Sequence, residues 1–195
     1  EEYINSGYET SELAEIEALR FAHLNNNEGA THYQEDGLKL LVLGDFVQSN
    51  TLFQLDLLKA AVPLAEDRFT IVYKPHPICN LDMTKYSMLD MEVVNSDIKE
   101  LSKTCDLAFT SSMSSAAVDA YMAGLPVISA LDKNKLNLSP LRGQEDVDFV
   151  SSPQELAEKL FMFDKARSRT RDHAEFFWFD PNLSRWSDIL GLRHK

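Results

Sequence analysis

Apolar runs alternate with helix-like segments between residues 38 and 163, and this alternation constrains the fold more than any other feature of the chain. The first run, LKLLVLGDF at 38–46, is apolar over most of its length, as in a strand that is buried on both faces. Strands that alternate with helices form βαβ units, in which the paired strands run parallel and the crossovers are right-handed. We therefore predict an α/β fold, a Rossmann-like three-layer domain with a mostly parallel sheet of about six strands.

Local signals assign the individual elements. Strands are expected at 38–46, 69–74, 91–95, 106–111, 126–131 and 147–150. Helices are expected at 51–65, 97–104, 114–124 and 152–163, the third closed by Gly124 and the last opened by Ser152, Pro153 and Glu155. A capped amphipathic helix is expected at 10–24, and two further helices are expected in the C-terminal tail.

We predict three parts in the chain. Residues 1–36 form a helix and a linker from an interdomain region, and residues 37–165 form the Rossmann-like domain. Residues 166–195 form C-terminal helices that pack on this domain. Because the chain begins with Glu1 instead of Met, we interpret it as an excised piece of a longer protein.

The charge and the cysteines exclude several functional classes. The net charge is -12, and residues 1–36 alone contain nine Asp and Glu against one Arg. This disfavours binding to nucleic acids or anionic membranes but permits a small phosphate site. No apolar run approaches the roughly 18 residues of a membrane span, and no Cys/His cluster has zinc spacing, so we expect no metal. Cys79 and Cys105 form no motif, and we interpret them as buried or incidental thiols in a reducing compartment.

A stiff histidine follows the second expected strand, in the sequence Lys74-Pro75-His76-Pro77. Parallel sheets bind ligands at the carboxyl ends of their strands, so residues at this position are candidates for a site. The two prolines restrict the backbone on both sides of the histidine. An imidazole held in this way can donate a hydrogen bond to a phosphate or protonate a leaving oxygen. The structural alternative is a surface turn, with the lysine extending its ammonium group into water.

A run of hydroxyl residues follows the fourth expected strand and opens the next helix. We call residues 110–115 the serine loop, and its polar members are Thr110, Ser111, Ser112, Ser114 and Ser115. Backbone N–H groups at a helix start, together with small hydroxyl side chains, favour the binding of a phosphate. The alternative is an ordinary N-cap serine with solvated neighbours, but five hydroxyls in six residues make the phosphate site the better interpretation.

Two further residues are weaker candidates. Asp119 lies in the helix after the serine loop, where a carboxylate can accept hydrogen bonds from ribose hydroxyls or simply face water, and we rate the two equally. Arg142, in the loop after the fifth expected strand, can fork onto a phosphate or a sugar carboxylate. A lone loop arginine is more often a surface ion. The aromatic segment 176–186 is better explained by packing than by sugar stacking.

The segment SSMSSAAVDAYMAGLPVIS resembles the nucleotide-sugar-binding segment of GT-B glycosyltransferases, with a loose match of one residue between Ala120 and Gly124. A His-Pro motif followed by a Ser-Ser motif is similar to that of the bacterial sialyl-, polysialyl- and Kdo-transferases, which use CMP-activated sugars. This resemblance implies that His76-Pro77 and Ser111-Ser112 contact the CMP phosphate, with Ser114-Ser115 as the alternative pair.

The combination of EALRF, KPHP, TSSMSSAAVDAYMAGLPVI and LNLSPLRG most resembles the C-terminal half of bacterial surface carbohydrate biosynthesis proteins. The resemblance implies one half of a GT-B fold, the donor-binding domain of a glycosyltransferase for surface polysaccharide or lipopolysaccharide. His76 would be the catalytic residue, and no metal or cofactor besides the nucleotide sugar would be needed. The general base and the site for a glycan or lipid-linked acceptor would lie on an N-terminal domain. The expected location is cytoplasmic, at the inner face of the membrane in the full-length protein.

Other functions fit the same motifs. CDP-glycerol polymerases of the teichoic-acid type have a similar arrangement and would make a phosphodiester. A UDP-GlcNAc 2-epimerase-like enzyme would be expected to carry more carboxylates near the serine loop. A non-catalytic nucleotide-sugar-binding or assembly module is the alternative from a different class.

Overall fold

The computed structural model describes residues 7, 9, 13–19, 37–65, 69–163 and 180–192. The chain divides into two compact units. One unit combines residues 1–26 with residues 172–195, and the other comprises residues 27–171.

The described part of the unit at 27–171 contains a six-stranded sheet in which all strands are parallel. The strand order is β3-β2-β1-β4-β5-β6. The strands are β1 (Leu38–Leu43), β2 (Phe69–Lys74), β3 (Met91–Val93), β4 (Leu107–Ser111), β5 (Val127–Ala130) and β6 (Val147–Val150). The predicted α/β, Rossmann-like class is therefore confirmed. The chain builds outward from β1 in one direction and then crosses back to β4, so the switch point of the topology lies between β1 and β4.

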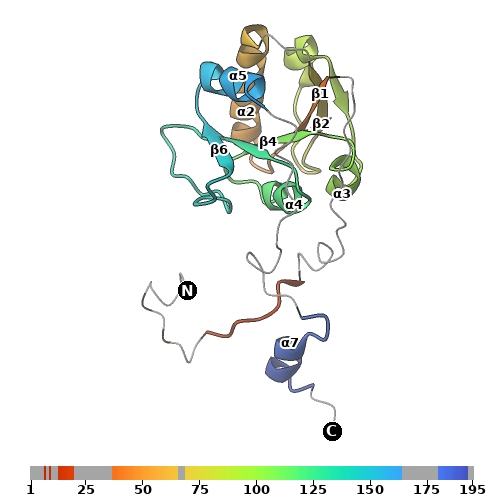
Figure 1. The fold of residues 1–195 in the computed structure, drawn as a ribbon, viewed down its shortest axis with the longest axis vertical. Helices are drawn as coiled ribbons and strands as arrows, with labels where there is room; N and C mark the ends of the chain where they lie inside the picture. Colours follow the sequence, from red (N-terminus) through yellow and green to blue (C-terminus); the bar gives the residue numbers. More distant parts are fainter. Residues whose placement is uncertain are drawn as a thin grey trace. The chain divides into compact units, whose positions relative to one another are not determined.

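Helices cover both faces of the sheet (Figure 1). One face carries α2 (Gln48–Ala61), the 3-10 segments η3 (Val62–Leu64) and η4 (Met83–Leu89), and α5 (Pro153–Phe161). The other face carries α3 (Ile98–Leu101) and α4 (Ala116–Met122). The result is the three-layer arrangement that the alternation of strands and helices predicts.

The core lies mainly between the sheet and the layer of α2 and α5. Leu40 and Val42 of β1 pack there against Leu55 and Leu58 of α2. Leu41 of β1, which points to the opposite face, is also fully buried. The central strand is thus buried on both sides, as its apolar run predicts.

Several helix ends follow the local chemistry of the sequence. Gly124 has a φ of +90° and closes α4, because Leu125 N–H reaches back to the Ala120 carbonyl at 3.1 Å, the longer bond of a Schellman motif. Ser152 caps α5 by accepting from the Glu155 N–H at 3.3 Å. Both expected ends are confirmed.

The segment η4 was not predicted. Its start is an Asx turn, in which Asp82 Oδ1 accepts from the Thr84 N–H at 3.0 Å. Its buried residues are Tyr86 and Leu89, which are too few to create a helical pattern of apolar positions.

The two cysteines are buried free thiols, as expected. Burial raises the pKa of the Cys105 thiol to about 11, so this thiol stays protonated near neutral pH.

In the other unit, the prediction of a helix at 10–24 is wrong for the residues of this segment that the structure describes, because residues 13–18 are not helical. Glu17 instead caps α7 (Ser184–Ile189): its carboxylate accepts from the Arg185 N–H at 3.0 Å and the Trp186 N–H at 3.2 Å. Tertiary hydrogen bonds therefore override the local propensity of this segment. The other helix expected in the tail lies outside the described residues, and the packing of the tail on the 37–165 domain stays a prediction.

Candidate functional site at the carboxyl edge of the sheet

The carboxyl ends of β1, β2, β4 and β5 lie side by side. Leu43 pairs with Lys74 on one side and with Thr110 on the other, and Thr110 pairs with Ser129 of β5. Residues 75–78 after β2, which we call the histidine loop, and the serine loop after β4 therefore flank the end of β1. This edge includes the switch point, where open α/β sheets bind ligands.

Asp45 occupies the centre of this edge and was missed in the sequence. Its carboxylate is 1% exposed and accepts hydrogen bonds from the Ser111 hydroxyl, from Asn50 Nδ2 at 3.3 Å and from the Val47 N–H at 2.9 Å. The Asp45 backbone N–H also donates to the hydroxyl of Thr51 at 2.8 Å. The residue thus ties the loop after β1 to α2 and to the serine loop. An Asp directly after a buried strand is a signal that could have identified it.

The hydroxyl of Ser111, the first serine of the serine loop, makes hydrogen bonds within the protein. Ser111 is buried, and its hydroxyl donates to Asp45 and accepts from the Met113 N–H at 3.3 Å. Ser114 is buried as well, and Ser115 is the N-cap residue of α4 without capping the helix through its hydroxyl. Ser112 is only half-buried, and its hydroxyl makes no hydrogen bond with the part of the chain that the structure describes.

Two hydroxyls at the carboxyl ends of β4 and β5 have no hydrogen-bond partner among the described residues. They are Thr110 Oγ1 and Ser129 Oγ, both fully buried. The two residues are in register on β4 and β5, so their side chains project to the same face of the sheet. A buried hydroxyl without a partner is usually satisfied by a water molecule or a ligand. The side chain of Thr110 is therefore buried beneath the surface of this edge and not exposed on it.

The histidine loop packs tightly on the loop after β1. Gly44 N–H donates to the Lys74 carbonyl at 2.9 Å, and a Cβ at Gly44 would lie 3.1 Å from both His76 N and Tyr73 Oη. The His76 ring meets Phe46 edge-on, with 6.2 Å between the ring centroids. A glycine at position 44 is thus what allows the histidine to approach the end of β1.

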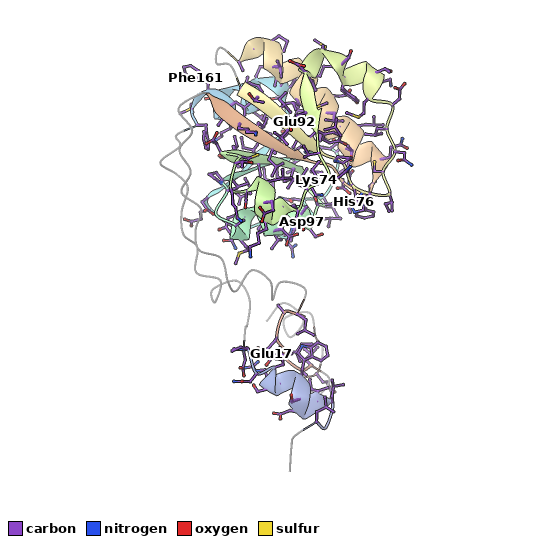
Figure 2. The ribbon with its side chains drawn as sticks, turned by 90° about the vertical axis from the view of Figure 1, so that its right-hand side faces the viewer. Glu17, Lys74, His76, Glu92, Asp97 and Phe161 are labelled. Carbon is purple, nitrogen blue, oxygen red and sulfur yellow. The ribbon has the colours of Figure 1, made fainter. Side chains whose placement is uncertain are left out.

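The imidazole of His76 is partly fixed by its own loop. Its Nδ1 accepts from the Ile78 N–H at 3.4 Å, an arrangement in which the neutral ring carries its proton on Nε2. Figure 2 shows His76 and Lys74 at the same edge of the unit. The Lys74 ammonium donates to the Asn95 carbonyl at 3.4 Å, and Pro77 is exposed.

The two weaker candidates lie further along the chain. Asp119 is half-buried in the first turn of α4. Arg142 is exposed in the loop between β5 and β6, where its guanidinium donates to the Ser139 carbonyl of the same turn at 3.2 Å.

Two cavities lie away from this edge. One, of about 390 Å³, is lined by residues near the amino ends of β4, β5 and β6, among them Leu107, Pro126 and Val127. The other, of about 330 Å³, lies between η3 and α5 and includes Phe161, which Figure 2 shows on the far side of the unit from His76. Neither of these two cavities is lined by a residue of the histidine loop or of the serine loop. Within the described ranges, no helix has the length and apolar character to cross a membrane.

No protein-family model matches the chain, and no curated protein is significantly similar to it in sequence. Solved structures do share its fold. The glycosyltransferase SnogD from Streptomyces nogalater has a TM-score of 0.53 and 16% identity, over 85% of this chain and 48% of its own. The catalytic domain of cholesterol-alpha-glucosyltransferase from Helicobacter pylori has a TM-score of 0.47 and 18% identity, over 64% of this chain and 84% of its own.

The similarity to SnogD shows the class of the fold. The chain contains an α/β, Rossmann-like domain of the kind present in SnogD, and it spans about half the length of that glycosyltransferase, 48%.

Proposed function

We propose that this chain is the donor-binding domain of a GT-B glycosyltransferase that acts in bacterial surface polysaccharide or lipopolysaccharide biosynthesis with a CMP-linked sugar donor. One observation carries the proposal: the histidine loop and the serine loop flank the end of β1 beside the switch point. The fold shared with SnogD supports the glycosyltransferase class, and the His-Pro and Ser-Ser motifs support the CMP-linked donor.

In this proposal, the phosphate of the donor lies between His76 and Ser112. Ser112 has a hydroxyl available for a ligand, whereas the hydroxyl of Ser111 is engaged with Asp45. The buried carboxylate of Asp45 would repel a phosphate placed directly on Ser111. Ser111 thus takes part in the site by holding the loop, and Lys74 contributes positive charge at the end of β2.

The chemical step breaks the bond between the anomeric carbon and the phosphate oxygen, and the electron pair stays on that oxygen. His76 stabilises the negative charge that develops there by donating a hydrogen bond from Nε2. In its imidazolium form, which carries a proton on both ring nitrogens, it would transfer a proton to this oxygen and become neutral. The nucleophilic acceptor hydroxyl and its general base belong to another domain. We therefore expect no sugar transfer by this chain alone.

Calorimetric titration of the chain with CMP, CDP, UMP and UDP tests the proposal. We expect CMP to bind and His76→Ala to weaken it by about tenfold, the effect of one charge-assisted hydrogen bond. The matched control is Ile78→Ala, which removes an exposed apolar side chain from the same loop and should leave the affinity unchanged.

The other outcomes separate the alternatives. A preference for uridine nucleotides would retain the donor-binding role and overturn the CMP assignment. Turnover of CDP-glycerol by the chain joined to its acceptor domain would indicate a glycerophosphotransferase. Failure of that joined protein to bind any nucleotide would contradict the proposal as a whole.

A further inference from the structure

Lys135, in the loop after β5, contacts α2 across the carboxyl edge of the sheet. Its ammonium donates a hydrogen bond to Asn50 Oδ1 at 3.2 Å, although the two residues are 85 positions apart in the sequence. The loop turns back at this point through a bond from the Lys135 N–H to the Asp132 carbonyl at 2.9 Å. The lysine thus has a defined partner outside its own loop.

The orientation of the Asn50 amide is set by Asp45. Asn50 Nδ2 donates to Asp45 Oδ2 at 3.3 Å and lies 3.3 Å from the Met113 sulfur in the serine loop. Because the amide has one acceptor oxygen and its nitrogen faces the carboxylate, the oxygen must face Lys135. Asp45 is 1% exposed and Asn50 is 8% exposed, so this pair is packed in place.

The same Asp45 oxygen accepts from Ser111. One buried carboxylate therefore orders two features of the edge, the serine loop directly and Lys135 through Asn50. The contact between Asn50 and Met113 places the end of the lysine next to the serine loop. An ammonium group has three protons, and the bond to Asn50 uses one of them, which leaves two for a ligand.

We propose that Lys135 is an anion-binding residue of this site, which contacts the phosphate of the ligand, and that Asp45 and Asn50 position it. That the ligand is a nucleotide rests on the proposed function. That the ligand is an anion rests on the Lys135 ammonium group alone. The structural alternative is that Lys135 only offsets the charge of Asp45. In that case its removal would change the stability of the chain and not its affinity for phosphate.

The test compares three ligands, CMP, cytidine and inorganic pyrophosphate, by calorimetry on the whole chain. We expect Lys135→Met to weaken the binding of CMP and of pyrophosphate about tenfold and to leave cytidine unchanged, because only the charged ligands lose a charge-assisted bond. Lys135→Arg should retain most of the affinity. The matched control is Lys133→Met, since Lys133 pairs with Glu155 at 3.7 Å and should not affect any of the three ligands.

The positioning role has its own readout. Asp45→Asn allows the Asn50 amide to turn over and present its nitrogen to Lys135, so it should weaken CMP binding about as much as Lys135→Met. The two substitutions combined should cost no more than either one, because they remove the same interaction. If the Asp45→Asn variant does not fold, Asn50→Ala tests the same positioning of Lys135, because it removes the amide that joins Asp45 to the lysine.

The outcomes distinguish this inference from the proposed function. Equal CMP and pyrophosphate affinities for the original chain and Lys135→Met would overturn the inference while the proposed function stands. Binding of pyrophosphate but of no nucleotide, lost in Lys135→Met, would support the inference and contradict the proposed function. If neither CMP nor pyrophosphate binds, the inference is overturned, and the absence of CMP binding also counts against the proposed function.

Discussion

The Ser111 hydroxyl donates a hydrogen bond to the buried carboxylate of Asp45, and this bond joins the end of β4 to the end of β1 at the switch point of the sheet. The two strands are neighbours through their backbones, but the side-chain bond fixes the loops that leave them. The Ser111 hydroxyl, which we expected to contact a phosphate, is therefore used to hold the two loops together. This relationship separates the roles of the two adjacent serines of the loop.

Ser111→Ala should destabilise the chain, and Ser112→Ala should not. The first substitution removes a donor from a buried carboxylate, which should lower the free energy of unfolding by about 1–3 kcal/mol. The second removes a half-buried hydroxyl with no bond to a described residue, so its effect should stay within about 0.5 kcal/mol. Urea unfolding measures both. Equal losses would contradict the separate roles.

Thr110→Val should leave the stability unchanged or raise it by up to about 1 kcal/mol, because it replaces a buried hydroxyl that has no partner among the described residues with a methyl group of similar shape. Thr51→Val is the control, because the Thr51 hydroxyl bonds to both the N–H and the carbonyl of Asp45. The control should lose about 1–3 kcal/mol in thermal or urea unfolding. A loss of the same size for Thr110→Val would show that a water molecule satisfies its hydroxyl.

Gly44→Ala should displace the histidine loop. The new Cβ would lie 3.1 Å from His76 N and from Tyr73 Oη, so the loop has to move by a few tenths of an ångström, at a cost of about 1–3 kcal/mol. The imidazole resonances of His76 should shift in NMR spectra. Gly143→Ala is a useful comparison: its positive φ of +88° makes it unfavourable through backbone strain, but its Cβ would meet no atom within 4 Å. That variant should leave the His76 resonances in place.

The cap of α7 should depend on pH through Glu17. Burial by itself would raise the pKa of this carboxyl, but hydrogen bonds from the backbone of Arg185 and Trp186 outweigh it, so the pKa lies below its ordinary value. The stabilisation is therefore fully present above the ordinary range of Glu, about 4.3, and is lost as the pH falls through the lowered pKa.

Amide chemical shifts of Arg185 and Trp186 during an acid titration measure this loss. Glu17→Gln should abolish the transition in both amides. Glu15→Gln, which alters an exposed carboxylate that pairs with the Arg185 side chain, should preserve it. A transition that survives in Glu17→Gln would show that another group controls the cap.

Local patterns predict much of the fold. The apolar runs at 38–46 and 69–74 correspond to β1 and β2, and the Ser152 and Gly124 signals mark real helix ends. Such signals lie within a few residues of one another, so they can be recognised without tertiary information. The helix at 10–24 fails over its described residues because Glu17 bonds to a helix start 168 positions away.

The candidate site likewise has one part that can be predicted from the sequence and another that depends on tertiary contacts. The strand-end rule is enough to place the histidine loop and the serine loop at one edge of a parallel sheet, because that edge follows from the alternation of strands and helices. Which hydroxyl is free for a ligand depends on Asp45, 66 positions before Ser111, and the lysine beside the loop depends on Asn50, 85 positions before Lys135. Bonds of this kind form only when packing brings distant segments together, and no periodicity in the chain encodes them.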